Sequence, residues 1–123
     1  MREATFVYKV VPGCEIAADI YRPDDQVVRP GIVWIHGGAL ITGSRSGIGP
    51  AQRDRYLDAG FCVISIDYRL APETRLASIA EDVRDAFAWI RSEGPRLFQI
   101  DPARLAVVGH SAGGYLALLS GYV

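Results

Sequence analysis

Two kinds of apolar segment follow one another along the chain. Residues 5–11 and 15–21 alternate apolar and polar side chains around a Pro12-Gly13 turn, which predicts an antiparallel hairpin. Three shorter runs are continuously apolar and β-branched, as is typical of strands buried on both faces of a largely parallel sheet. These runs are residues 31–35, 61–66 and 105–108.

A long amphipathic helix is predicted for residues 78–92. Ser78 and Glu81 form a capping-box pattern, and apolar side chains then recur at helical spacing along one face. We expect Gly94 and Pro95 to end this helix.

Two further helices complete the pattern. Residues 52–59 predict a weaker helix ended by Gly60, and the small apolar residues 112–122 predict a buried one. Strands and helices that alternate after a hairpin predict an α/β layered domain with right-handed crossovers. We expect residues 1–123 to form one domain.

Composition narrows the function classes. The chain has 13 basic and 14 acidic residues, a formal net charge of −1, and 50% hydrophobic residues. A disordered segment would be poorer in apolar residues, and a nucleic-acid-binding protein would carry a basic excess. We expect a globular domain without nucleic acid as a partner.

The two cysteines, Cys14 and Cys62, match no metal-ligand spacing. Both are expected to lie in apolar, strand-like runs, so we expect buried free thiols rather than a disulfide. The N-terminus lacks the apolar stretch of a secretory signal, and no run is long enough to span a membrane. We therefore expect a cytoplasmic protein.

The first chemical motif is the sequence Gly-His-Ser-Ala-Gly-Gly at residues 109–114. It directly follows a predicted strand and opens a predicted helix, so Ser111 is expected on a sharp, strained turn. Glycines flank the serine because a β-carbon there would collide with the neighbouring strand and helix. A glycine-rich packing or phosphate-binding turn is the alternative interpretation.

The second motif is His-Gly-Gly-Ala at residues 36–39, which follows another predicted parallel strand. Successive small residues allow backbone N–H groups to face a pocket, as stabilisation of an oxyanion requires. A plain glycine turn would explain this motif if it stood alone.

Three motifs together resemble the α/β-hydrolase family, in its esterase/lipase branch related to hormone-sensitive lipase. They are residues 36–39, residues 67–73 (DYRLAPE) and residues 109–114, and the resemblance covers nearly the whole chain. It implies a partial α/β-hydrolase fold, in which a hairpin precedes parallel strands with flanking helices and the chain ends after the nucleophile helix.

The resemblance also implies roles for individual residues. Ser111 would be the nucleophile, and the N–H groups of Gly38, Ala39 and Ala112 would form the oxyanion hole. No metal or organic cofactor is expected. The residues expected to shape the site are His36, Gly37, Gly109, His110 and Gly113. Relatives usually have a third glycine at position 39 and an aspartate at position 110, which leaves the subfamily open.

A base for the serine is missing from the pattern. The family order is serine, acid, histidine, yet the 12 residues after Ser111 contain no acid and no histidine. We expect the side chain of His110 to point away from the serine hydroxyl and His36 to be structural. Asp67 and Glu73 are each expected to have a structural role, in a salt bridge or in a turn.

In the family the strand that corresponds to residues 105–108 lies inside the sheet, with further strands beside it. Those further strands are not in this sequence, so residues 105–108 are expected to form an open, apolar sheet edge. The chain therefore resembles the N-terminal half of a serine carboxylesterase acting on small acyl esters. The edge would pair with a complementing half or a second copy. Two alternatives stay open: an inactive, self-associating hydrolase domain, and an amidase or peptidase with the same fold.

Overall fold

The computed structural model describes residues 1–119, and side chains through residue 117. Its strands are β1 (Arg2–Val11), β2 (Cys14–Arg22), β3 (Arg29–Ile35), β4 (Cys62–Ile66) and β5 (Ile100–Gly109). Its helices are the 3₁₀ turn η1 (Arg45–Gly47), α1 (Pro50–Asp58), α2 (Leu76–Phe98) and α3 (Ala112–Leu119). The expected final residues of the last helix, 120–122, lie outside the described residues.

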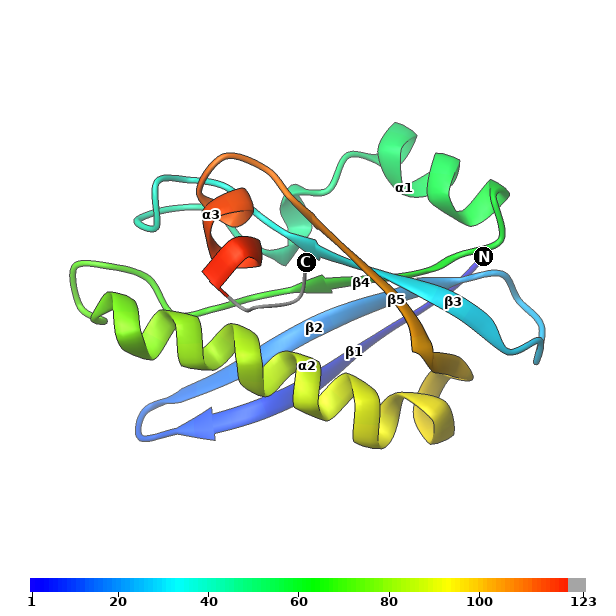
Figure 1. The fold of residues 1–123 in the computed structure, drawn as a ribbon, viewed down its shortest axis with the longest axis horizontal. Helices are drawn as coiled ribbons and strands as arrows, with labels where there is room; N and C mark the ends of the chain where they lie inside the picture. Colours follow the sequence, from blue (N-terminus) through cyan, green and yellow to red (C-terminus); the bar gives the residue numbers. More distant parts are fainter. Residues whose placement is uncertain (120–123) are drawn as a thin grey trace.

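The strands form one mixed sheet in the order β1-β2-β4-β3-β5. β1 pairs antiparallel with β2 and β2 antiparallel with β4, whereas β3 lies parallel to both β4 and β5. The predicted architecture of a hairpin followed by parallel strands with flanking helices is confirmed (Figure 1). Because β3 and β5 are parallel neighbours, the loops that leave their carboxyl ends meet at one edge of the sheet.

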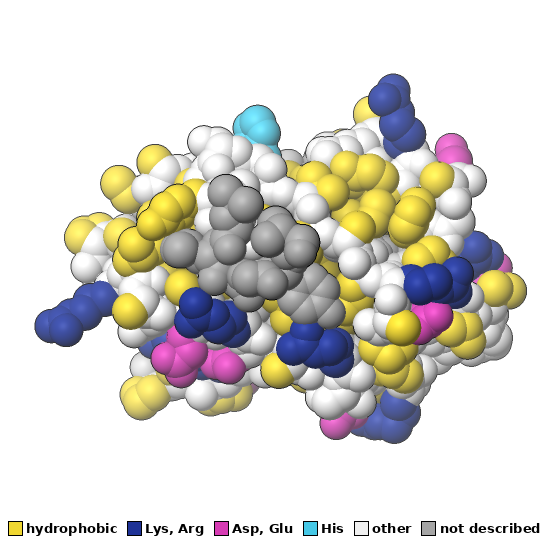
Figure 2. Space-filling view, in the orientation of Figure 1, with side chains coloured by type: hydrophobic (Ala, Val, Ile, Leu, Met, Phe, Trp, Pro, Cys, Tyr) yellow, Lys and Arg dark blue, Asp and Glu magenta, His cyan; other side chains and the backbone are white. Residues whose placement is uncertain are grey.

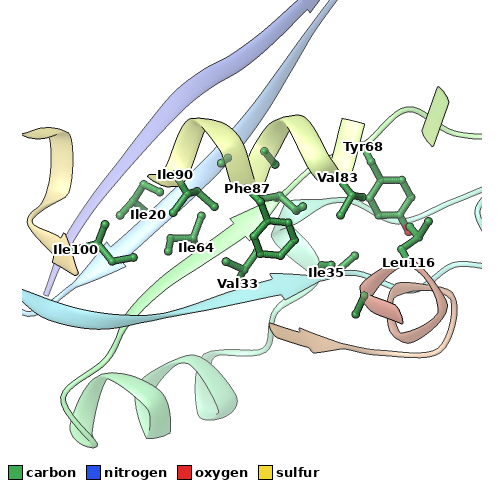
Figure 3. Close-up of a cluster of buried hydrophobic side chains, with 14 of the residues drawn as sticks. Ile20, Val33, Ile35, Ile64, Tyr68, Val83, Phe87, Ile90, Ile100 and Leu116 are labelled. Atoms are coloured by element: carbon green, nitrogen blue, oxygen red, sulfur yellow. The ribbon is translucent and has the colours of Figure 1, made fainter. Parts of the chain in front are cut away.

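Helices cover both faces of the sheet. On one face, Val83, Phe87 and Ile90 of α2 pack with the strand residues Val33 and Ile64, and α3 lies beside them (Figure 3). On the other face, a smaller cluster joins residues of the sheet to α1. Each fully buried side chain of this size stabilises the fold by about 1.5–3 kcal/mol. Packing on both faces therefore stabilises the parallel strands.

The long helix differs from its prediction at both ends. α2 begins at Leu76 with no side-chain cap, so the predicted capping box is wrong. It also continues through Pro95 to Phe98, where a stop was predicted. Phe98 is 3% exposed and its ring lies 5.7 Å from that of Trp89. Burial of this last turn offsets the hydrogen bond that proline removes.

The predicted free thiols are confirmed for both cysteines, whereas the predicted burial is confirmed for Cys62 and wrong for Cys14. Both thiols are free, but Cys14 is exposed because it directly follows the hairpin turn at the end of the sheet. Cys62 lies in the central strand β4, where burial raises the pKa of its thiol to about 12.

Within the described part of the chain, β5 pairs only with β3, so the predicted open edge is confirmed. None of the described helices is long and apolar enough to cross a membrane. Acidic and basic side chains lie next to one another over the face shown in Figure 2, in keeping with the near-zero net charge.

Candidate active site

Ser111 lies on the turn between β5 and α3, in the left-handed region with φ of 55°. The turn is tight because its glycines contact backbone. An added β-carbon at Gly109 would lie 2.3 Å from the carbonyl oxygen of Gly113, and one at Gly113 would lie 2.0 Å from that of Ile35. The strained serine turn and its need for glycine are as predicted. The backbone therefore holds Ser111 outward, and its side chain is exposed.

The loop after β3 contacts this serine turn directly. A β-carbon at Gly37 would lie 2.7 Å from the carbonyl oxygen of His110 and 3.3 Å from the β-carbon of Ser111. The next residues turn sharply, with positive φ at Gly38 (122°) and Ala39 (55°). The two motifs, 72 residues apart at Ala39 and Ser111, thus form one surface.

Three backbone N–H groups at this surface lack an acceptor. Among the described residues, none accepts a hydrogen bond from the N–H of Gly38, Ala39 or Ala112. Ala112 is also the first residue of α3, where the helix dipole favours negative charge. Backbone N–H groups without an acceptor in the protein are the kind of donor that binds an oxygen with developing negative charge.

An open cavity of about 630 Å³ lies in front of both loops. It is lined by the serine turn at His110 and Ser111, by the loop after β3, and by the side chains of Trp34 and Ile41. A small organic molecule has room to approach the serine here.

The buried side chain of His36 packs against the loop that follows β3. It is 2% exposed, its ring stacks on Tyr68 at 4.1 Å, and its Nδ1 lies 2.7 Å from the carbonyl oxygen of Gly37. The Tyr68 hydroxyl donates to the His36 carbonyl oxygen at 2.7 Å. Burial lowers the pKa of His36, so its ring is neutral at pH 7. These contacts favour the structural role expected from the sequence.

Neither histidine is hydrogen-bonded to Ser111. The ring of His36 stacks on Tyr68 and its Nδ1 lies near the Gly37 carbonyl oxygen, and the hydrogen bonds that His110 makes to described residues involve its backbone. Its N–H donates to Ile35 at 3.2 Å, and its carbonyl oxygen accepts from Gly113 at 2.9 Å. A base for Ser111 is therefore not present among the described contacts.

The acidic residues of the third motif are structural, as predicted. Asp67 forms a salt bridge with Arg45 and accepts a hydrogen bond from the Arg45 N–H at 2.7 Å. Glu73 lies in the turn that follows.

Sequence reasoning missed the partners of this motif. Arg45 binds Asp67 across 22 residues, and Asp82, fully buried, binds Arg69 through both carboxylate oxygens at 2.8 Å. Hydrogen bonds from Arg69 and Lys9 outweigh burial and lower the pKa of Asp82. The only local signal was an acidic residue on the apolar face of the predicted helix 78–92, at position 82.

The fold is that of an esterase-like α/β-hydrolase. Residues 18–123 match the model of the BD-FAE family, and the chain belongs to this family of α/β-hydrolase-like esterases.

Solved esterase structures resemble the chain closely. It superimposes on an esterase from Thermogutta terrifontis, Est2, with a TM-score of 0.83 and 29% sequence identity, covering 93% of this chain and 42% of that one. For a bacterial heroin esterase the TM-score is 0.80 with 34% identity, covering 94% and 36%. The predicted α/β-hydrolase fold and its esterase relationship are confirmed.

Curated proteins similar in sequence to this chain include large polyketide synthases. The chain is 38% identical over 130 residues to non-reducing polyketide synthase atr1 of Stereocaulon alpinum, covering 98% of this chain and 5% of that protein. It is 45% identical over 127 residues to non-reducing polyketide synthase Preu6 of Preussia isomera, covering 96% and 6%. The chain thus spans a small fraction of these synthases and less than half of the solved esterases.

Proposed function

We propose that this chain carries the nucleophile and oxyanion hole of a serine hydrolase acting on small acyl esters. The observation that carries the proposal is the strained Ser111 turn, which contacts a loop with unpaired N–H groups. Ser111 is the nucleophile, and the N–H groups of Gly38, Ala39 and Ala112 bind the oxyanion. Structural similarity to two esterases supports the reaction class.

The reaction proceeds through an acyl-enzyme. The Ser111 oxygen attacks the ester carbonyl and loses its proton to a histidine, while the carbonyl oxygen becomes an oxyanion. The carbon–oxygen bond to the alcohol then breaks, and the histidine protonates the leaving alkoxide. Water, deprotonated by the same histidine, then attacks the acyl-enzyme carbonyl. The bond between the acyl carbon and the Ser111 oxygen breaks, the histidine returns the proton to that oxygen, and the carboxylic acid is released.

We infer that this histidine and its acid lie outside residues 1–123. The contacts of His36 and His110 support this, because neither is hydrogen-bonded to Ser111. So does the coverage of the solved esterases, whose remaining length is more than half of each chain. The open edge of β5 offers a place for the missing part to continue the sheet. Residues 1–123 would then be one part of the hydrolase domain.

A small acyl group fits the size of the cavity. The Thermogutta terrifontis esterase has been solved with propionate and with butyrate bound. The cavity of about 630 Å³ beside Ser111 accommodates groups of this kind.

A second candidate substrate is an acyl thioester. The polyketide synthase relatives motivate this candidate, because they are 38% and 45% identical to the chain, against 29% and 34% for the two esterases. The same serine and N–H groups serve a thioester, since its carbonyl also becomes an oxyanion when attacked.

The test compares the full protein that contains these residues with residues 1–123 alone. Hydrolysis of p-nitrophenyl acetate, its anilide and an acetyl thioester is measured for the unmodified protein, for Ser111→Ala, and for Ser92→Ala on the exposed face of α2. Paraoxon labelling, followed by intact mass, reports the reactive serine. One solved form of the Thermogutta terrifontis esterase is phosphorylated by this compound.

We expect Ser111→Ala to lose hydrolysis and labelling in the full protein, and Ser92→Ala to retain both. Ester or thioester turnover well above anilide turnover identifies the substrate class. Serine-dependent turnover by residues 1–123 alone would contradict the inferred external histidine. Unchanged turnover in Ser111→Ala would refute the proposed nucleophile.

A further inference from the structure

The loop between β3 and η1, residues 36–44, has no regular secondary structure although it carries two of the proposed oxyanion N–H groups. Such a loop is mobile unless other contacts fix it. Its start is fixed by the hydrogen bond from Tyr68 to His36, and its middle by one from the Ala71 N–H to the Leu40 carbonyl oxygen at 2.7 Å. The end of the loop needs a separate anchor.

Arg45 is the first residue after the loop and binds the sheet at four points. Its N–H donates to Asp67 Oδ1 at 2.7 Å, and its carbonyl oxygen accepts from the Ser65 hydroxyl at 2.6 Å. Its guanidinium donates to Asp67 Oδ2 through one nitrogen and to Asp19 Oδ1, at 2.9 Å, through Nε. Both the backbone and the side chain of Arg45 are therefore tied to neighbouring strands, β2 and β4.

Backbone contacts within the loop link the position of Arg45 to the N–H groups of Gly38 and Ala39. Gly43, two residues before Arg45, packs so closely on the start of the loop that a β-carbon there would lie 2.4 Å from the Gly37 carbonyl oxygen. The carbonyl oxygen of Gly38 accepts from the N–H groups of Ile41 and Thr42, both at 3.0 Å. Displacement of residue 45 would therefore shift the backbone on both sides of Gly38.

The geometry suits an arginine better than a lysine. Asp19 lies on β2 and Asp67 directly follows β4, and two nitrogens of one planar guanidinium reach both carboxylates. The Arg45 side chain is 32% exposed, and those of Asp19 and Asp67 are 13% and 23% exposed, so water screens these ion pairs only in part and they also stabilise the fold. In addition, they fix the position of the loop that precedes Arg45.

We propose that Arg45 is a positioning residue for the oxyanion N–H groups of Gly38 and Ala39, acting through Asp67 and Asp19. The proposal rests on the function proposed above, and it adds a residue that lies outside the substrate cavity. Arg45 does not contact the reacting atoms, so its loss should change the geometry of the transition-state site and leave substrate binding nearly intact.

The first measurement is hydrogen–deuterium exchange of the full protein, in Arg45→Met, Arg45→Lys and the control Arg96→Met. Arg96 also forms an ion pair, with Glu93, but lies on the exposed face of α2. In Arg45→Met we expect exchange in residues 38–45 to rise about tenfold or more, with β2 and β4 unchanged. Arg45→Lys should give a smaller rise, and Arg96→Met none.

The second measurement is p-nitrophenyl acetate turnover per paraoxon-titrated serine, which removes any unfolded fraction from the comparison. We expect kcat for Arg45→Met to fall by about tenfold to a hundredfold with KM changed little. Arg45→Lys should recover part of the loss. The affinity for a trifluoromethyl ketone, which forms a tetrahedral adduct, should fall by a similar factor.

The outcomes separate this proposal from the proposed function. Unchanged exchange in residues 38–45, or unchanged kcat per titrated serine, would overturn the role of Arg45. An unaffected rate in Ser111→Ala would instead refute the proposed function, and the exchange data would still decide whether Arg45 holds the loop.

Discussion

The strain at Ser111 can be measured by comparing its replacement with glycine and with alanine. Ser111 has φ of 55°, a conformation in which a β-carbon collides with the neighbouring carbonyl group. Its side chain is exposed and makes no hydrogen bond to the described residues. Ser111→Ala keeps the β-carbon and removes only the hydroxyl, so we expect it to leave the free energy of unfolding nearly unchanged.

Ser111→Gly removes the β-carbon and with it the strain. The left-handed conformation costs a residue other than glycine about 1–2 kcal/mol. Glycine in turn lowers the free energy of unfolding by about 0.5–1 kcal/mol, because it gives the unfolded chain greater conformational freedom. The net expectation is that Ser111→Gly exceeds Ser111→Ala in stability by about 1 kcal/mol, or about 2–5 °C in Tm for a domain of this size.

Urea denaturation and thermal unfolding followed by circular dichroism measure this difference. The matched control is Ser92, an exposed serine inside α2, where the same pair of substitutions should give the opposite order. There, glycine should be less stable than alanine by about 1 kcal/mol. Equal stabilities of Ser111→Gly and Ser111→Ala, or the helix order at position 111, would refute the strain that this reasoning assigns to the serine turn.

Three further predictions concern the contacts around the site. Gly113→Ala should destabilise the fold by about 3 kcal/mol or more, because its β-carbon would meet the Ile35 carbonyl oxygen at 2.0 Å. Gly114→Ala, with its nearest atom at 3.5 Å, should be tolerated in the same denaturation assay. Tyr68→Phe should cost about 1–2 kcal/mol, since it removes the donor to a buried carbonyl oxygen, whereas the exposed Tyr115→Phe should cost little. Burial lowers the pKa of His36, so the unfolded chain binds the proton first as pH falls. Stability should therefore decline below about pH 6.5, and His36→Phe should flatten this part of a stability–pH profile.

Local patterns determined much of the fold. Continuous apolar runs identified the three parallel strands, because a strand buried on both faces needs apolar side chains at every position. Alternation identified the hairpin, because a strand buried on one face needs them only at every second position. The serine turn could also be predicted from a local pattern. Its glycines are required by contacts within six consecutive residues and the strand beside them.

The ends of α2 were not predictable in this way. The capping-box pattern at Ser78 and the Gly94-Pro95 pair both describe local preferences, each amounting to a few kcal/mol at most. Phe98 packs on Trp89 of the same helix and on Phe6 of β1, an element far away in sequence, and these contacts outweigh the local preferences. The exposure of Cys14 has a similar origin, since only the sheet shows that the hairpin turn projects beyond its neighbours.

The strands, the hairpin, the strained serine and the two glycine-containing loops follow from local sequence patterns, because their causes lie within a few neighbouring residues. Three contacts follow only from the three-dimensional arrangement: Gly37 lies against Ser111, Tyr68 stacks on His36, and Arg45 joins Asp19 to Asp67. These pairs are brought together by parallel strand pairing and by packing on a shared core. Such contacts depend on distance in space, and a side chain gives no sign in its own sequence neighbourhood of which distant partner it will meet.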